Sequence, residues 1–346
     1  MGGTTPSGVR AVCSHDEDTA TMGVEAARIA LSSLSDSINP AAVWFSSSNP
    51  PYMDKTNANV IHAALQLDTN VAAYDFGGAE KSGIGALKVA LDSSKTLLLI
   101  QSDIRTGLPS SEDEGHGGDA ASALLIGGED YGDLIARYLG GSSANEEFIG
   151  RWRNPHEPNS KSWEERFVVT KYLQLIDSAW QEALSVTELS SGDISTVVIS
   201  GSNNRAKNQI SKILGVEKPR IDLFEDVGIA GTADATLLLT HALETSEPGE
   251  IIALVVLSDG IEVLLFEAGN QKNQSKDTIS SQINSRNEIT YQRFLQWKGN
   301  LDVQPPNRPA PSRISASAAA RESEWKHGFI ASKAEKSGMI HMPPSR

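Results

Sequence analysis

The chain has a single cysteine, Cys13, among its 346 residues. One cysteine excludes an intramolecular disulfide and any metal site that needs several thiolates from this chain. Cys13 lies in the N-terminal segment beside charged residues. We interpret it as a small packing side chain and not as a nucleophile.

Long hydrophobic runs are also missing. The longest ones, Thr96–Ile100 and Ile251–Leu257, have the length of strands and fall far short of the roughly 20 residues that span a membrane. The first twelve residues contain no apolar stretch and no cleavage pattern, so we expect no signal peptide. These features predict a soluble cytoplasmic protein.

Basic residues are in the minority, with 30 Lys and Arg against 44 Asp and Glu and a net charge of −14. The acidic residues are spread along the chain. This balance argues against nucleic acid or an anionic membrane as the main partner, because either would favour a basic face. An anionic small ligand held by local arginines and helix N-termini stays compatible with it.

The most informative stretch is residues 74–87, YDFGGAEKSGIGAL. Its pattern predicts a buried strand that turns through glycines into a helix. In many enzymes such an elbow holds a nucleophile at the helix N-terminus, where unpaired N–H groups and the helix dipole stabilise an anion. Here the tip carries neither cysteine nor serine, and Glu80 stands where we expect the nucleophile.

Along the chain, helix and strand patterns alternate in two similar series. The order predicts a pseudo-duplicated α/β protein with halves over residues 1–160 and 161–300. Residues 301–324 are rich in Pro, Ala and Ser and predict a solvated tether, and residues 325–346 form a compact tail. The predicted helices are 19–34, 56–67, 83–92, 168–184, 204–214 and 234–243, and the predicted strands are 42–46, 70–76, 96–101, 196–200, 251–258 and 261–267. Residues 128–145 and the following segment are predicted to form a long connection, and residues 268–288 a polar linker.

Several segments together resemble the thiolase superfamily, in the branch of hydroxymethylglutaryl-CoA synthase and type III ketoacyl synthase. The resemblance spans nearly the whole chain and is carried by residues 15–27 (HDEDTATMGVEAA), 50–55 (PPYMDK), 75–78 (DFGG), 102–109 (SDIRTGLP), 118–121 (GDAA), 152–153 (WR) and 163–167 (WEERF). It implies a five-layered αβαβα thiolase fold, usually dimeric, with a tunnel for an acyl-CoA or acyl-carrier substrate.

At the family's reactive positions the chain departs from the pattern. The acyl-accepting cysteine corresponds to Glu80, the general-base histidine to Ser200, the asparagine or aspartate to Ile229, and the synthase's acidic residue to Ser48. A carboxylate is a poorer nucleophile than a thiolate, and its mixed anhydride would be unstable. We therefore expect the ordinary chemistry of the fold to be lost, as in a pseudoenzyme.

Four further residues are candidates for contact with coenzyme A or its thioester: Lys81, Asn203, Arg205 and Arg166. Arg166 lies in a segment with Trp152 and Trp163 that has two interpretations. It either clasps the phosphate or adenine of CoA, since arginine pairs bidentately with phosphate, or consists of buried structural tryptophans with an arginine ion pair. The same two interpretations apply to Arg105 and Arg205.

We expect no metal site and no required cofactor. His15 and His116 lie near acidic residues, but loops with scattered acids are common. The tail, with His327 and His341, resembles the start of a zinc-ribbon module whose Cys-x-x-Cys pair corresponds here to Ala334 and Ser337. Compared with the family, both ends of the chain are expected to be shortened.

Two functional hypotheses follow from the sequence. In the first, the chain is a non-catalytic or weakly catalytic subunit of an acyltransferase complex, as a homodimer or with a cysteine-bearing thiolase and a zinc-ribbon/OB-fold protein. In the second, it is an active condensing or decarboxylating enzyme with Glu80 as acid/base and Lys81 or Asn203 polarising the thioester.

Overall fold

The computed structural model describes residues 9–32, 39–128, 134–155, 157–214, 220–270, 277–305, 307–309, 311–326 and 330–344. They divide into two compact units, residues 1–301 and 302–346. Within the described residues no helix is long and apolar enough to cross a membrane.

The first sheet has the strand order β2–β1–β3–β4. β1 runs parallel to both β2 and β3, whereas β4 is antiparallel to β3. β3 is buried along its whole length, as its run of apolar residues predicts. The strands are β1 (Ala42–Ser47), β2 (Ala72–Gly77), β3 (Leu97–Asp103) and β4 (Ala120–Ile126).

The second sheet has the order β5–β11–β10–β8–β9. β10 and β11 form the predicted antiparallel hairpin, with Leu257 opposite Ile261. Asp259 and Gly260 at its turn both have positive φ, which the Asp-Gly pair tolerates well. The strands are β5 (Ala136–Ala144), β8 (Ile194–Gly201), β9 (Arg220–Ile221), β10 (Ile251–Leu257) and β11 (Ile261–Ala268).

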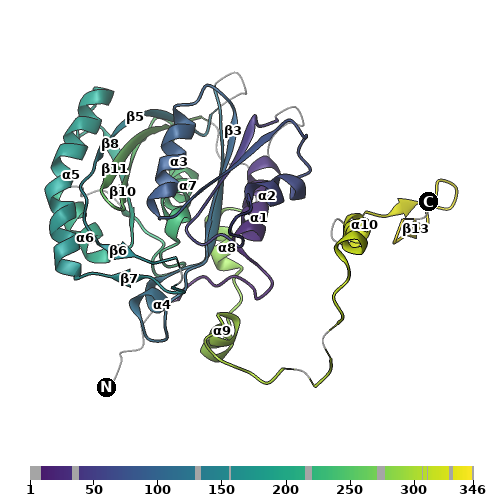
Figure 1. Cartoon of the computed structure of the whole chain (residues 1–346). Coiled ribbons are helices and arrows are strands. Elements are labelled where there is room, and N and C mark those ends of the chain that lie inside the picture. The colour runs from purple at the N-terminus through teal and green to yellow at the C-terminus, as the bar shows by residue number, and fades with distance from the viewer. Residues whose placement is uncertain are drawn as a thin grey trace. The chain divides into compact units, whose positions relative to one another are not determined.

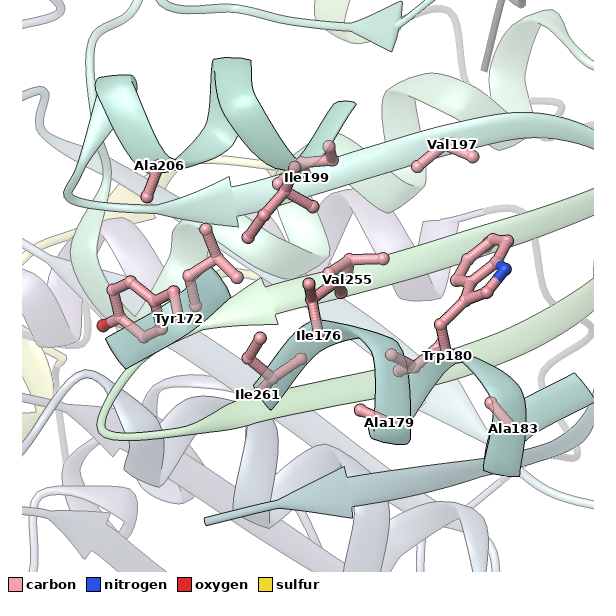
Figure 2. Packing of buried hydrophobic residues seen from close by; sticks show 14 of the residues in the cluster. Tyr172, Ile176, Ala179, Trp180, Ala183, Val197, Ile199, Ala206, Val255 and Ile261 are labelled. Carbon is pink, nitrogen blue, oxygen red and sulfur yellow. The ribbon is translucent and has the colours of Figure 1, made fainter. Parts of the chain in front are cut away.

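Helices cover both outer faces of the sheets and fill the space between them (Figure 1). The outer layer on the second sheet packs an apolar stripe of α5 against β8, β10 and β11, with Ile176 and Trp180 in its centre (Figure 2). The middle layer contacts both sheets, and a third cluster joins the other outer helices to the first sheet. In layer order the helices are α5 (Glu165–Thr187) and α6 (Asn204–Ile213), then α3 (Lys81–Leu91) and α7 (Asp234–Thr245), then α1 (Thr19–Ser32) and α2 (Ala58–Ala64).

This five-layered αβαβα order confirms the predicted fold class. The three larger clusters of buried apolar side chains in the described residues lie at the boundaries between layers, and each depends on the 3.6-residue period of the helix that faces it. Short elements complete the unit: α4 (Glu112–His116), β6 (Arg151–Trp152), β7 (Lys161–Ser162), a 3₁₀ turn (Gly231–Ala233), α8 (Ile279–Asn284) and α9 (Tyr291–Trp297).

The connection predicted over residues 128–145 contains strand β5, so that part of the prediction is wrong. β5 pairs with β11 in the second sheet, although it precedes residue 160. The glycines of β5 weaken its strand pattern in the sequence, but the close approach of β11 requires them. A Cβ on Gly141 would lie 2.3 Å from the carbonyl oxygen of Val263 on β11. The register shifts between Leu265 and Phe266, and Gly140 has φ +149°.

The segment predicted as a polar linker contains helix α8, and residues 291–297 form α9. The second unit contains α10 (Ala316–Lys326), β12 (Ser332–Lys333) and β13 (Ile340–His341). Part of the predicted tether is therefore helical, because the run from Ala316 is rich in alanine, the best helix former.

Candidate functional site

The elbow at residues 77–80 carries the central residue of the site. Strand β2 ends at Gly77, Gly78 adopts φ +104°, and α3 begins directly after Glu80. The Ser82 hydroxyl donates to the carbonyl oxygen of Gly77 over 2.8 Å and fixes the turn. The strand–glycine–helix order is confirmed, and it places Glu80 at the N-terminal end of a helix in the middle layer. The prediction that the strand is buried is wrong, because β2 is an edge strand without a fully buried residue.

The Glu80 carboxylate is bound by two arginines. Its Oε1 lies 2.7 Å from Nη1 of Arg105 and 3.4 Å from Nε of Arg151. Arg151 also makes two hydrogen bonds to the Asp113 carboxylate, of 2.6 and 3.1 Å. The side chains of Glu80 and Arg105 are only 14% and 9% exposed, so this ion pair is largely shielded from water.

Burial by itself would lower the pKa of Arg105, but three nearby carboxylates reverse that effect. Glu80, Asp103 and Asp113 together raise the pKa of the guanidinium above its ordinary value. Arg105 is therefore a fixed positive charge beside the elbow.

A small cavity brings together three of the four positions predicted to be reactive. Glu80, Ser200 and Ile229 all line it. The free space inside accommodates about one water molecule, too little for an acyl chain. The remaining lining is Ile84, Gly201, Gly231, Thr232, Asp234, Ala235, Val256, Leu257 and Ser258.

Ser200 and Ile229 are engaged in structural contacts. The Ser200 hydroxyl donates to Oδ2 of Asp234 over 2.6 Å, and Asp234 accepts a second bond from the Ala230 amide. Ile229 is 5% exposed, and its amide donates to the carbonyl oxygen of His116 over 2.8 Å. Neither side chain offers a free base or a hydrogen-bond donor to a ligand in the cavity.

Ser48, at the fourth position, does not line the cavity and donates hydrogen bonds to a buried carboxylate instead. Its hydroxyl donates to Oδ2 of Asp103 over 2.8 Å, and its amide donates to Oδ1. Asp103 also accepts from the Ser47 hydroxyl and from the amides of Asn49 and Thr232. Since Thr232 lines the cavity, Asp103 ties the ends of β1 and β3 to the cavity wall.

A chain of buried polar contacts also fixes the first turn of α3. The Gln101 amide donates to the carbonyl oxygen of Gly83 over 2.5 Å and accepts from the Thr236 hydroxyl over 2.6 Å. This chain joins α3, β3 and α7, so the elbow is held from both sides.

Another acidic group of the site, Asp259, lies at the tip of the β10–β11 hairpin. Burial raises the pKa of the Asp259 carboxyl, and the charge of Glu80 raises it further. The Lys81 ammonium opposes this effect; it donates to the backbone oxygen of Asp259 over 2.9 Å and also contacts the Asn145 side chain. Lys81 thus anchors the hairpin and does not line the cavity.

The other candidates for cofactor contact lie apart from the cavity lining. Asn203 caps α6, because its side-chain oxygen accepts from the Ala206 amide over 2.8 Å. Arg205 lies 3.6 Å from Glu165 at the surface, and Arg166 is exposed. Their proposed roles toward coenzyme A stay predictions.

The tryptophan segment is not a buried cluster. Trp163 is 57% exposed, and its ring centroid lies 6.3 Å from that of Trp152, so the interpretation as buried structural tryptophans is wrong for Trp163. Arg153 donates to the carbonyl oxygen of Ser48 over 2.8 Å and ties this segment to the end of β1.

No group of three or more His, Cys, Asp or Glu side chains in the described part of the chain is arranged to hold a metal ion. His15 packs against Trp297 and His116 against Phe224, with ring centroids 5.8 and 5.3 Å apart. In the tail, the Ala334 amide donates to the backbone oxygen of Met339 across the hairpin of β12 and β13. His327 lies outside the described residues.

Sequence reasoning did not find Asp103, Asp234 or Arg151 as parts of the site. For Asp103 a signal was available, because it lies with Arg105 in the segment 102–109 that carries the family resemblance. Arg151 is 71 residues from Glu80 in sequence, and no local pattern links the two.

The comparisons with known proteins agree with the geometry. No protein-family model matches the chain. The chain is 28% identical over 306 residues to hydroxymethylglutaryl-CoA synthase of Thermococcus sibiricus, covering 84% of this chain and 87% of that protein. It is 25% identical over 306 residues to the enzyme of the same name from Methanopyrus kandleri, with the same coverage.

Among solved structures, a single-residue variant of OleA from Xanthomonas campestris superposes with a TM-score of 0.63 at 16% identity, covering 75% of this chain and 83% of that one. FabH, the 3-oxoacyl-(acyl carrier protein) synthase III of Pseudomonas aeruginosa, superposes with a TM-score of 0.63 at 17% identity, covering 76% of this chain and 86% of that one. The chain is thus thiolase-like in fold and similar in sequence to hydroxymethylglutaryl-CoA synthases.

Proposed function

We propose that this chain is a non-catalytic or weakly catalytic subunit of an acyltransferase assembly of the thiolase superfamily. The proposal rests on one observation: the residue at the nucleophile position, Glu80, is a carboxylate paired with Arg105 and Arg151. In this ion pair, the carboxylate oxygen that would have to attack a thioester lies beside two cations. A carboxylate is also a weaker nucleophile than a thiolate.

The rest of the cavity supports the same proposal. A general base is needed to activate the attacking group or to abstract a proton. Ser200 instead donates its hydroxyl to Asp234, and Ile229 has no polar side chain. A coenzyme A thioester stays our candidate ligand, on the likeness to hydroxymethylglutaryl-CoA synthases, and the small cavity favours its binding outside the space around Glu80.

An exposed sheet edge supports assembly with another subunit. β2 is the edge strand of the first sheet, and Tyr74 on it is 56% exposed. An edge strand presents unpaired backbone groups to a second strand. We propose either a homodimer or a complex with a cysteine-bearing thiolase and a zinc-ribbon/OB-fold protein.

The alternative is an active condensing or decarboxylating enzyme that uses Glu80. One observation favours it: the Glu80 side chain lines the same cavity as Ser200, where a reacting group would lie. The two proposals differ in whether removal of the Glu80 carboxylate changes turnover.

The test measures turnover of acetyl-, acetoacetyl- and malonyl-CoA by the purified chain and by Glu80→Ala, with intact-mass detection of acylated protein. We expect no acylation and no difference between the two proteins. Turnover by the wild-type chain that is lost in Glu80→Ala would overturn the subunit proposal. Co-expression with a cysteine-bearing thiolase encoded nearby in the genome tests the partner, since a subunit should co-purify with it.

A further inference from the structure

Contacts that do not involve Glu80 hold the backbone of Arg105 and the guanidinium of Arg151. Arg105 donates its amide to Oδ1 of Asp119 over 2.9 Å, and its carbonyl oxygen accepts from Nη2 of Arg10 over 3.0 Å. Arg151 is fixed by its two hydrogen bonds to Asp113. The Arg151 guanidinium and the Arg105 backbone are therefore held independently of Glu80. Because the Arg105 side chain is only 9% exposed, we expect both guanidinium groups to stay near the same point when the Glu80 carboxylate is removed.

Glu80 also lines the cavity described above, while its Oε1 lies against Arg105 and Arg151, which are not among the lining residues. The wall on the cavity side is largely apolar, with Ile84, Ile229 and Leu257 among its members. Two cations at its carboxylate and apolar residues in the neighbouring cavity give Glu80 surroundings that suit a short aliphatic carboxylate.

We propose that Arg105 and Arg151 form a binding site for a small aliphatic carboxylate, and that Glu80 is its built-in occupant. The side chain of Glu80 beyond Cα is chemically a propionate group, and beyond Cβ an acetate group. Attachment to the chain gives it a high effective concentration, so free carboxylates do not compete at ordinary levels. This inference does not depend on the proposed function, because it concerns binding by the arginine pair and not turnover or assembly.

The test removes the occupant and supplies it from solution. Glu80→Ala leaves a space the size of acetate, and Glu80→Gly leaves a space the size of propionate. Thermal unfolding is measured with sodium acetate, propionate or chloride at equal ionic strength, and binding is measured by calorimetry. We expect each variant to be stabilised by its matching carboxylate, with a Kd of roughly 1–10 mM. This affinity is weaker than the highest affinity that a ligand of so few atoms can reach. Chloride should not stabilise either variant.

Two controls separate the site from general salt effects. Glu165→Ala removes a glutamate that also opens a helix and also pairs with an arginine, but is 56% exposed; it should show no response to carboxylates. Adding Arg151→Gln to Glu80→Ala should weaken acetate binding at least about tenfold, because one of the two cations is gone.

Equal responses to acetate and chloride in both Glu80 variants, or acetate binding unchanged by Arg151→Gln, would overturn the proposal. If Glu80→Ala does not fold, Glu80→Ser supplies a favoured N-cap residue with a similar space. In that case the measurement is the refolding yield in acetate against chloride. A higher yield in acetate supports the site, and equal yields contradict it.

Discussion

At the scale of single residues, the site is defined by ion pairs and hydrogen bonds among its own side chains. Glu80 forms ion pairs with Arg105 and Arg151, and the Ser200 hydroxyl donates a hydrogen bond to Asp234. Ser48 is bound by the Asp103 carboxylate and does not line the cavity. Removing one member of such a set leaves the rest buried without a partner, which is costly. The residues at the positions predicted to be reactive are therefore integrated into the packing.

The single thiol allows a sharp test at this scale. Burial raises the pKa of Cys13 from 9.0 to about 12, and the Asp119 carboxylate adds to that rise. Only the thiolate reacts with disulfide reagents, so labelling of the native chain at pH 8 should be at least about 100-fold slower than labelling in urea. The measurement is the rate of reaction with a coloured aromatic disulfide, and equal rates in the two conditions would contradict it.

The same shift gives stability a pH dependence. Because the folded chain holds the proton more tightly than the unfolded chain, the contribution of Cys13 is complete below about pH 9 and is lost as the pH rises toward 12. Urea unfolding between pH 8 and 10.5 should show a steeper loss of stability for the wild type than for Cys13→Ser.

Residue-level roles were only partly predictable from sequence. The elbow pattern located Glu80, because glycines before a helical run are a local signal. The binding of Glu80 by Arg105 and Arg151 joins segments 25 and 71 residues away, and only the tertiary structure determines that contact. Lys81 and Asn203 were expected to face a ligand, but a hairpin contact and a helix cap account for their side chains.

At the scale of elements, α9 anchors the end of the first unit to the loop that carries Arg105. Lys298, which follows α9, contacts Oδ2 of Asp119 over 2.5 Å, and their side chains are 6% and 0% exposed. Asp119 also receives Arg10 and the amide of Arg105. The Tyr291 hydroxyl adds a bond to Glu114 in the same loop. The position of Arg105 therefore depends on a helix that lies far along the chain, in the last part of the first unit.

We expect Lys298→Met to lower the free energy of unfolding by roughly 3 kcal/mol, because it leaves a buried carboxylate with one cation fewer. Hydrogen exchange should increase across residues 286–301. The matched control is Arg286→Gln in the same segment, whose pair with Asp226 is 42% and 49% exposed and should contribute less than about 1 kcal/mol. Equal effects of the two substitutions would show that α9 is not anchored through Asp119.

Elements with strong periodicity were predictable, whereas those that depend on a distant partner were not. The hairpin of β10 and β11 and the long helix α5 follow from apolar patterns and an Asp-Gly turn. β5 carries glycines in its middle and is a strand because β11 offers an unpaired edge. α8 and α9 are short helices of six and seven residues that begin after the caps Thr278 and Thr290, and a threonine cap alone is too common a signal to predict a helix.

At the scale of the whole molecule, the exposed edge of the first sheet predicts how copies of the chain associate. β2 pairs with β1 on one side, and its other side is an edge of the sheet. The adjoining loop is fixed against β2 because Asp75 accepts from the amides of Asn57 and Ala58, over 2.7 Å each. That loop presents Tyr52 and Met53, which are 50% and 82% exposed, and Tyr74 on β2 is 56% exposed. A rigid, apolar-rimmed strand edge of this kind favours pairing over solvation.

We expect the wild-type chain to elute at about twice its mass of 37.0 kDa, and Tyr74→Lys to elute as a monomer, since a lysine on an edge strand opposes pairing. The measurement is light scattering after size exclusion at micromolar concentration. Val186→Lys is the matched control, because Val186 is 57% exposed on α5, away from the first sheet, and should leave the mass unchanged. A monomeric wild type, or an unchanged mass for Tyr74→Lys, would contradict the prediction that β2 forms the interface. Loss of a homodimer together with retained binding of a cysteine-bearing thiolase would instead assign the edge to self-association alone.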